Sequence, residues 1–259
     1  MARPAHIELG DGTTIPILYE DRSVIAIDKP AGWMLVPHSW QKTNRNLQAA
    51  VVSAIGAGHF WARSRNLKFL RYVHRLDAET TGILLFVRSQ GALETFSDLF
   101  ESRRMEKTYL AAVQGLPTHA EWTCTLKLAP DPAEVGRMCV DDRNGKEAET
   151  RFKVLQRGTD TALVEAKPVT GRTHQIRVHL TSARHPVVSD PLYGPKAGGG
   201  NRNTGRPAKQ LEMGLRAVSL GYQDPFTKRR ILIKAPTEEF LRKFGFAPTG
   251  SSAQSMPAS

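Results

Sequence analysis

The sequence predicts an α+β fold built around a mixed, largely antiparallel sheet with flanking helices. Segments with strand character and segments with helix character are interspersed without a regular alternation, which argues against a parallel sheet with crossover helices. The run GILLFV, residues 82–87, is short and continuously apolar, as is typical of a strand buried on both faces. Residues 89–104 instead place four apolar side chains at helical spacing behind Ser89, a favourable N-cap residue.

The N-terminal elements are predicted in the following order. Residues 1–14 are expected to be a flexible lead-in. Two short strands follow within residues 17–29, separated by a Glu-Asp-Arg-Ser turn and ended by Pro30. Residues 40–60 carry apolar residues at helix-like spacing and predict a helix. Residues 71–77 predict a strand that leads through a polar loop into the buried apolar run.

The rest of the chain predicts more strands and two helices. The strands are expected at residues 107–115, 121–128, 147–156, 161–169, 216–225 and 229–236. Residues 173–183 suit a strand or a helix, and we favour a helix that begins after Thr173 as cap. Residues 237–246 predict a short closing helix, so that one domain spans residues 15–246. Residues 247–259 are small and polar, and predict a disordered tail.

The composition indicates a basic protein with reduced thiols. The chain has 36 Lys and Arg against 25 Asp and Glu, a net charge of +11. This excess favours a polyanionic partner such as RNA, although a merely basic enzyme remains an alternative. Cys124 and Cys139 form no CxxC pair, which argues against a disulfide framework or a structural zinc. With no secretory leader and no apolar run of membrane-spanning length, we expect a cytoplasmic protein without membrane contact.

The stretch RYVHRLDAETTG, residues 71–82, is the first candidate site. Five bases between Arg63 and Arg75 have no acid among them, and Asp77 follows at the end of the predicted strand. On a strand, Arg75 and Asp77 would project to the same face. The pair could therefore be a plain ion pair at the end of a strand, or Asp77 could be a reactive carboxylate.

Two further segments complete the candidate site. Residues 168–180 contain two arginines and two histidines without an acid, and they lack the spacing of a metal site. They could form a solvated basic face, or supply an arginine that keeps Asp77 ionised. Tyr109 lies on a predicted strand among small residues, where it could be a core residue or could stack on a nucleobase.

Five motifs in order resemble the RluA-type pseudouridine synthases: IDKPAG, HRLDAETTG, KTYLAAVQG, GRTHQIRVHL and DPLYG. The resemblance runs from about residue 15 to about residue 240. It implies the pseudouridine synthase catalytic fold with a central cleft. It also implies isomerisation of specific uridines to pseudouridine in structured RNA, ribosomal or transfer, by a catalytic aspartate. No metal and no organic cofactor would be needed, and we expect a monomer without an obligatory protein partner.

The resemblance also implies roles for individual residues. Asp77 matches the catalytic aspartate, Tyr109 the tyrosine that stacks on the base, and Arg177 the arginine that pairs with the aspartate. Arg75 matches a residue that enters the space left by the extruded uridine. The residues expected to contact RNA are Arg75, Arg71, Lys68, Arg172, His174, Lys196 and Arg202. The aromatic residues among the bases before Asp77, Trp61 among them, are also expected to suit stacking on RNA.

The chain departs from the family pattern in small ways that leave the identity of the RNA open. Thr81 stands where a serine is usual, Ser189 where a glycine is usual, and Arg216 where a histidine is common. Many members carry an N-terminal S4 domain, which we do not expect here, so the catalytic domain would recognise RNA itself. Two rival hypotheses remain: an RNA-binding protein without turnover, and a hydrolase that uses Asp77 and Glu79 as a carboxylate pair.

Overall fold

The computed structural model describes residues 3–35, 45–194 and 212–248. Within them, eleven strands form one sheet whose central path runs β1-β2-β3-β5-β12-β6-β11-β10-β7, with β4 paired to β5 and β13 paired to β12. The strands of this sheet are β1 (His6–Glu8), β2 (Thr14–Glu20), β3 (Val24–Lys29), β4 (Arg71–Tyr72), β5 (Thr81–Val87), β6 (Glu106–Gln114), β7 (Glu121–Cys124), β10 (Thr150–Arg157), β11 (Thr161–Pro168), β12 (Leu215–Gln223) and β13 (Arg230–Lys234).

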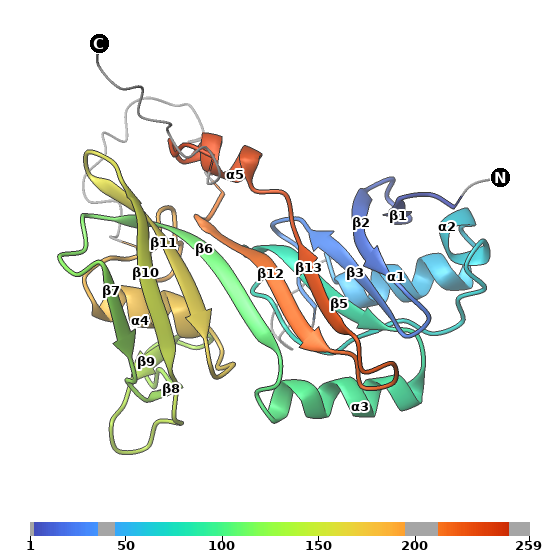
Figure 1. Ribbon diagram of the computed structural model, residues 1–259, viewed down its shortest axis with the longest axis horizontal. Helices are drawn as coiled ribbons and strands as arrows, with labels where there is room; N and C mark the ends of the chain where they lie inside the picture. Colours follow the sequence, from blue (N-terminus) through green and yellow to red (C-terminus); the bar gives the residue numbers. More distant parts are fainter. Residues whose placement is uncertain (1–2, 36–44, 195–211, 249–259) are drawn as a thin grey trace, which may run out of the picture.

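The remaining elements are a small hairpin and five helices in the described part of the chain. The hairpin consists of β8 (Leu128–Pro130) and β9 (Met138–Val140). The helices are α1 (Leu47–Gly56), α2 (Phe60–Arg63), α3 (Gln90–Glu101), α4 (Gln175–Ser182) and α5 (Glu238–Lys243). Figure 1 shows α1 and α2 beside the β1–β3 end of the sheet and α4 beside β10 and β11, with β6 and β12 in the middle.

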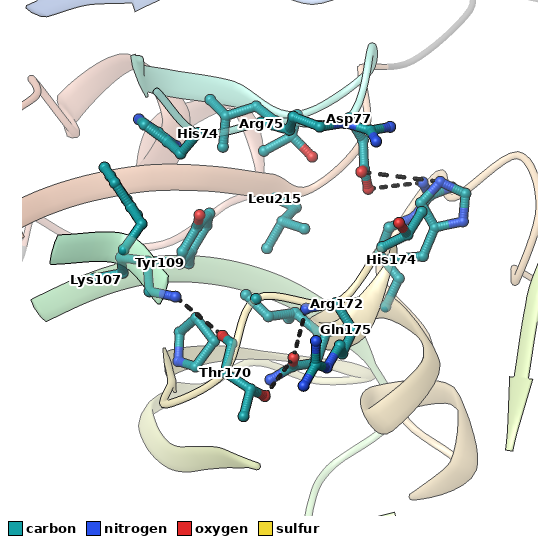
Figure 2. Close-up of a pocket in the computed structure, with 18 of the residues that line it drawn as sticks. His74, Arg75, Asp77, Lys107, Tyr109, Thr170, Arg172, His174, Gln175 and Leu215 are labelled. Atoms are coloured by element: carbon teal, nitrogen blue, oxygen red, sulfur yellow. Dashed lines mark hydrogen bonds and ion pairs between the residues drawn. The ribbon is translucent and has the colours of Figure 1, made fainter. Parts of the chain in front are cut away.

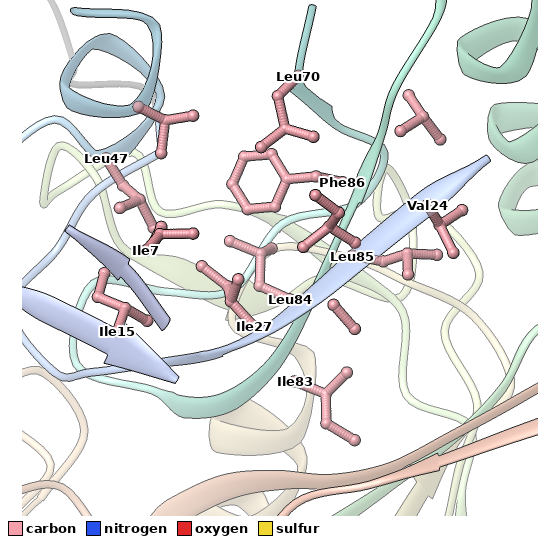
Figure 3. Packing of buried hydrophobic residues seen from close by; sticks show 14 of the residues in the cluster. Ile7, Ile15, Val24, Ile27, Leu47, Leu70, Ile83, Leu84, Leu85 and Phe86 are labelled. Carbon is pink, nitrogen blue, oxygen red and sulfur yellow. The ribbon is translucent and has the colours of Figure 1, made fainter. Parts of the chain in front are cut away.

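The predicted α+β class and the largely antiparallel sheet are confirmed. Among the strands that the structure describes, every pair is antiparallel except β5 with β12, which are parallel. The run in β5 is buried at all seven positions, and Figure 3 shows its side chains packed against those of β1, β2 and β3. Burying this run on both faces removes apolar surface from water at the centre of the N-terminal half.

The helix predicted at residues 89–104 is confirmed as α3. The Ser89 hydroxyl accepts a hydrogen bond from the Ala92 N–H at 3.2 Å, which caps the first turn. The helix predicted at residues 173–183 is also confirmed, as α4, but the expected cap is wrong. His174, with a φ of +55°, is the N-cap residue instead of Thr173.

The lead-in expected at residues 1–14 is wrong for most of its length. β1 pairs with β2, and Ile7 and Leu9 are buried in the core of the N-terminal half. Burial of the Ile7 and Leu9 side chains offsets the entropy that is lost when this segment becomes ordered. The tail predicted at residues 247–259 lies outside the described residues from 249 onward.

The strand predicted at residues 71–77 is shorter than expected, because only Arg71 and Tyr72, which form β4, pair with β5. After Tyr72 the Val73 N–H still donates to the Leu85 carbonyl at 3.2 Å. The chain then leaves the sheet, and Nε2 of the His74 ring accepts the Leu85 N–H at 3.0 Å in place of a backbone partner. Arg75 and Asp77 therefore lie on a loop between β4 and β5. The loop returns to the sheet at the start of β5.

Gly82 fixes where that loop meets the centre of the sheet. Its φ is +105°, and a β-carbon built on it would lie 2.1 Å from the backbone oxygen of Ala217 in β12. Glycine therefore allows β5 and β12 to approach each other in parallel. The approach brings the Asp77 loop beside the start of β12 and beside β6.

Candidate active site

A cavity of about 610 Å³ opens between the Asp77 loop, β6, the start of β12 and the loop that precedes α4. Figure 2 shows the labelled side chains converging on it from these separate segments. Its lining includes Asp77, Tyr109 and Arg177, the three residues predicted to be catalytic. The structure therefore brings together residues that lie up to 100 positions apart in the chain.

Arg177 contacts Asp77 directly. Its Nη1 donates to Oδ2 of Asp77 at 2.9 Å, which is the pairing expected from the sequence. The Arg177 side chain is 1% exposed, whereas that of Asp77 is 22% exposed and faces the cavity. Arg177 contacts Oδ2 of Asp77, whereas Oδ1 lies 3.8 Å from Nε2 of His174.

Asp190 is a second and more deeply buried partner of Arg177, which the sequence analysis did not identify. Nε and Nη2 of Arg177 donate to its two carboxylate oxygens, each at 2.8 Å. The backbone N–H groups of Leu192 and Tyr193 donate to Oδ1 at 2.9 and 3.0 Å. Burial raises the pKa of Asp190, but the hydrogen bonds and charge of Arg177 outweigh it and hold that pKa below its usual range. The DPLYG motif was the signal available in the sequence.

Tyr109 and Lys107 point into the cavity from the same face of β6. Burial raises the pKa of the Tyr109 hydroxyl well above its usual value, with the nearby Asp77 charge adding to the effect. Tyr109 is therefore a neutral ring beside Asp77, suited to contact with a planar base. Nζ of Lys107 donates to the Thr170 carbonyl at 2.9 Å, and burial lowers the pKa of Lys107 to about 8.

Lys29 supports the loop that carries Asp77, a role that the sequence did not indicate. It is fully buried, and its Nζ donates to the carbonyls of Pro30, Ala78 and Thr80 at 3.0, 2.9 and 2.9 Å. Burial lowers the pKa of Lys29 to about 8, while the charge of Asp77 acts in the opposite direction. Two of the three carbonyls follow Asp77 within three positions, so Lys29 fixes the loop backbone on which that carboxylate stands.

His74 fixes the other side of the same loop. Its ring stacks on Phe100 of α3 with centroids 4.7 Å apart, while Nε2 accepts the Leu85 N–H. Burial lowers the pKa of His74 to about 3, so the ring is neutral at physiological pH.

The residues predicted to contact RNA do not all reach the cavity. Arg75, Arg172 and His174 line it, and Arg75 is exposed. Arg71 and Lys68 are exposed but are not among the lining residues. Lys196 and Arg202 lie outside the described residues.

The expectation that Trp61 stacks on RNA is wrong, and Arg65 in the same basic run is buried too. Arg65 is buried in an ion pair with Glu20, and its guanidinium also donates to the carbonyls of Pro4 and Trp61. The Trp61 ring is buried as well, and its Nε1 donates to the Glu8 carbonyl. These side chains anchor α2 and the following turn to the N-terminal strands.

Arg216 occupies the position where a histidine is common in the family. Its Nη2 donates to Oδ2 of Asp28 at 2.6 Å, and its Nε donates to the Pro236 carbonyl. Asp28 directly precedes Lys29, so this ion pair joins β12 to the strand that supports the Asp77 loop. The arginine that stands in place of the common histidine therefore has an ion-pair partner in this chain, Asp28.

Within residues 3–35, 45–194 and 212–248, no three His, Cys, Asp or Glu side chains are grouped to hold a metal ion. Across the same ranges, no helix has both the length and the apolar character needed to cross a membrane.

Comparison with known proteins agrees with this geometry. The family model for RNA pseudouridylate synthase matches residues 23–182. The chain belongs to this family. It is 34% identical to the ribosomal large subunit pseudouridine synthase C of Vibrio vulnificus (strain CMCP6) over 232 residues, 88% of this chain and 67% of that protein. It is also 34% identical to the protein of that name from Escherichia coli (strain K12) over 238 residues, 88% of this chain and 68% of the relative.

Solved structures support the same family and fold. Human RNA Pseudouridylate Synthase Domain Containing 1 superposes with a TM-score of 0.66 at 26% identity, over 86% of this chain and 84% of that one. Human RNA Pseudouridylate Synthase Domain Containing 4 has a TM-score of 0.68 at 22% identity, over 88% and 92%, and shows the shared fold. The family expected from the five motifs and the α+β pseudouridine synthase fold are confirmed. The protein is an RNA pseudouridine synthase, and therefore an isomerase.

Proposed function

We propose that the protein isomerises specific uridines of large-subunit ribosomal RNA to pseudouridine, with Asp77 as the catalytic carboxylate. The observation that carries the proposal is the ion pair of Asp77 with the buried Arg177, in a cavity also lined by Tyr109. The choice of ribosomal over transfer RNA follows the names of the bacterial relatives. The enzyme acts as a monomer in the cytoplasm without an obligatory protein partner.

The reaction is an internal rearrangement. The N1–C1′ bond of uridine breaks with its electron pair leaving on uracil, the base turns, and C5 bonds to C1′. C5 then loses its proton and N1 gains one, so no oxidant and no energy source are consumed. An ionised carboxylate with one oxygen free can promote the step covalently or as a base. Arg177 binds Oδ2 of Asp77 and orients Oδ1 toward the cavity.

RNA must deliver an unstacked uridine to this cavity, because a base inside a helix cannot reach a half-buried carboxylate. Tyr109 stacks on the extruded base, and the exposed Arg75 occupies the gap that the base leaves in the helix. Arg172 and His174 contact the same nucleotide from the opposite wall. The exposed bases Arg71 and Lys68, together with Lys196 and Arg202, bind the phosphate backbone, which contributes affinity without choosing the uridine.

The structure favours this function over a hydrolase that uses two carboxylates. Asp77 lines the cavity, whereas Glu79 is not among the lining residues. The family of the chain argues against the other rival, an RNA-binding protein without turnover.

The test is to incubate the purified protein with unmodified large-subunit ribosomal RNA and, separately, with transfer RNA, and to map pseudouridine. The wild type should modify ribosomal RNA at one or a few positions, and Asp77→Asn should bind the RNA equally well without forming product. Glu79→Gln is the matched control and should stay active. Product from Asp77→Asn would refute the assignment of the carboxylate, and product on transfer RNA alone would refute the choice of substrate.

A further inference from the structure

One ring nitrogen of His174, Nε2, has no hydrogen-bond partner among the described residues. The residue is the N-cap of α4, and its side chain is 13% exposed at the cavity wall. Its Nε2 lies 3.8 Å from Oδ1 of Asp77, the oxygen that does not accept the Arg177 hydrogen bond. Figure 2 shows His174 beside the Asp77 carboxylate. This separation is too long for a hydrogen bond, so Nε2 faces the reactive carboxylate without bonding to it.

Tyr193 decides which ring nitrogen of His174 carries the proton. The Tyr193 hydroxyl oxygen accepts the Met138 N–H at 2.8 Å and lies 2.9 Å from Nδ1 of His174. Among the described residues, Nδ1 is the acceptor within reach of the hydroxyl proton. The Tyr193 O–H therefore donates to Nδ1, and the proton of the neutral ring resides on Nε2. This tautomer is assigned from the hydrogen-bond network.

The surroundings of His174 hold the ring neutral and in one orientation. Burial lowers the pKa of His174, although the nearby charge of Asp77 opposes that change. The Tyr193 ring packs edge-on against the His174 ring, and the Arg177 guanidinium lies 5.1 Å from the centre of the Tyr193 ring. His174 itself has a φ of +55°, a left-handed conformation that a non-glycine residue adopts at a cost and that is common at functional sites.

We propose that Nε2–H of His174 donates a hydrogen bond to an oxygen of the target uridine beside C1′, either the ribose 2′-hydroxyl or uracil O2. The inference rests on the proposed role of Asp77. Both oxygens are attached to atoms bonded directly to the N1–C1′ unit. A carboxylate that reaches this unit through Oδ1 therefore places them close to Nε2. A donor at O2 stabilises the charge that develops on the departing uracil, whereas a donor at the 2′-hydroxyl distinguishes ribose from deoxyribose.

A pair of substitutions separates the two ring nitrogens. Glutamine places its amide nitrogen near the position of Nε2, and asparagine places its nitrogen near the position of Nδ1. His174→Asn should slow the single-turnover rate at saturating RNA by about 10²-fold, and His174→Gln should stay within about tenfold of the wild type. Rescue by glutamine cannot come from an easier backbone, because asparagine is the better residue for a left-handed φ.

Tyr193→Phe tests the assignment of the tautomer. In the wild-type background this substitution should slow the single-turnover rate. Nδ1 of His174 then no longer accepts a hydrogen bond from Tyr193, so the ring proton can move from Nε2 to Nδ1. In the His174→Gln background it should change the rate little, because an amide has no tautomer to set. Melting temperatures of all variants show whether any loss of rate comes from unfolding.

The substrate identifies the acceptor. RNA with 2′-deoxyuridine at the target position lacks one oxygen, and RNA with 2-thiouridine replaces the other by a poor acceptor. The ratio of wild-type to His174→Asn rates should fall to about 1 on the substrate that lacks the partner of His174, because the donor then has nothing to bind. Equal rates for His174→Gln and His174→Asn, or an unchanged ratio on both substrates, would overturn the inference.

Failure of this inference is distinguishable from failure of the proposed function. Product that depends on Asp77, together with unchanged ratios, overturns the role of His174 alone. Absence of product from the wild type overturns the proposed function. In that case the dissociation constants for unmodified RNA test the contact. Equal dissociation constants for the wild type and His174→Asn would overturn it. Weaker binding by His174→Asn, but not by His174→Gln, would support it.

Discussion

Replacing Arg177 with methionine would show which of its two carboxylates depends on it most. The Asp190 side chain is 0% exposed and forms the bidentate pair, whereas Asp77 is 22% exposed and accepts one hydrogen bond. Methionine keeps much of the apolar stem but leaves Asp190 buried without its counter-charge, which costs about 3–5 kcal/mol of the free energy of unfolding. Solvent at the cavity screens Asp77, so its share of that cost is smaller.

A second substitution in the Arg177→Met background assigns the cost. Asp190→Asn removes the buried charge and keeps an Oδ1 that accepts the N–H groups of Leu192 and Tyr193. It should therefore recover more than half of the lost free energy, and Asp77→Asn should recover less. Urea unfolding followed by tryptophan fluorescence measures each value, provided that the m-values agree. Equal or greater recovery with Asp77→Asn would refute the reasoning.

The pH dependence gives an independent check on Asp190. In the wild type its pKa is depressed, so its contribution to stability is full above the ordinary aspartate pKa and is lost as pH falls through the folded value. Without Arg177, burial remains and raises that pKa above the unfolded value. The stability deficit of Arg177→Met should then shrink as pH falls from about 7 to about 5. A constant deficit over this range would contradict a buried Asp190 as its source.

Two other positions carry predictions. Lys29→Met should lower the free energy of unfolding by about 1–3 kcal/mol, because three carbonyls in a partly buried site lose their donor. It should also slow turnover, because the Asp77 loop loses its support. Single-turnover rates on folded protein check this, and an unchanged rate would argue against a positioning role. Gly82→Ala should lower the melting temperature by many degrees, since its β-carbon would lie 2.1 Å from a backbone oxygen of β12. Gly91→Ala is the control, because a β-carbon there meets nothing within 4 Å and alanine favours the helix; similar losses at both sites would contradict the argument.

Local patterns in the sequence determined most of the secondary structure and the identity of the family. The apolar run in β5 and the Ser89-capped spacing of α3 depend on neighbouring residues, so they can be recognised without knowledge of the fold. The residues alone allowed an arginine of residues 168–180 to reach Asp77, but only the resemblance singled out Arg177, because 100 positions separate the two residues. Their order and spacing in the chain alone left a solvated basic face as an alternative.

Tertiary structure decided which polar groups are buried, and with them the support of the site. Lys29, Asp190 and Tyr193 stand in the IDKPAG and DPLYG motifs, but nothing in these motifs indicates their partners, which come from other segments of the chain. In the same way, Arg65 and Trp61 looked like part of an RNA-binding run, and the fold buried both against the N-terminal strands. The physical reason is that a polar or aromatic side chain is equally compatible with solvent and with a satisfied buried site. Whether such a side chain is exposed or buried depends on the partners that the folded chain brings within hydrogen-bond distance.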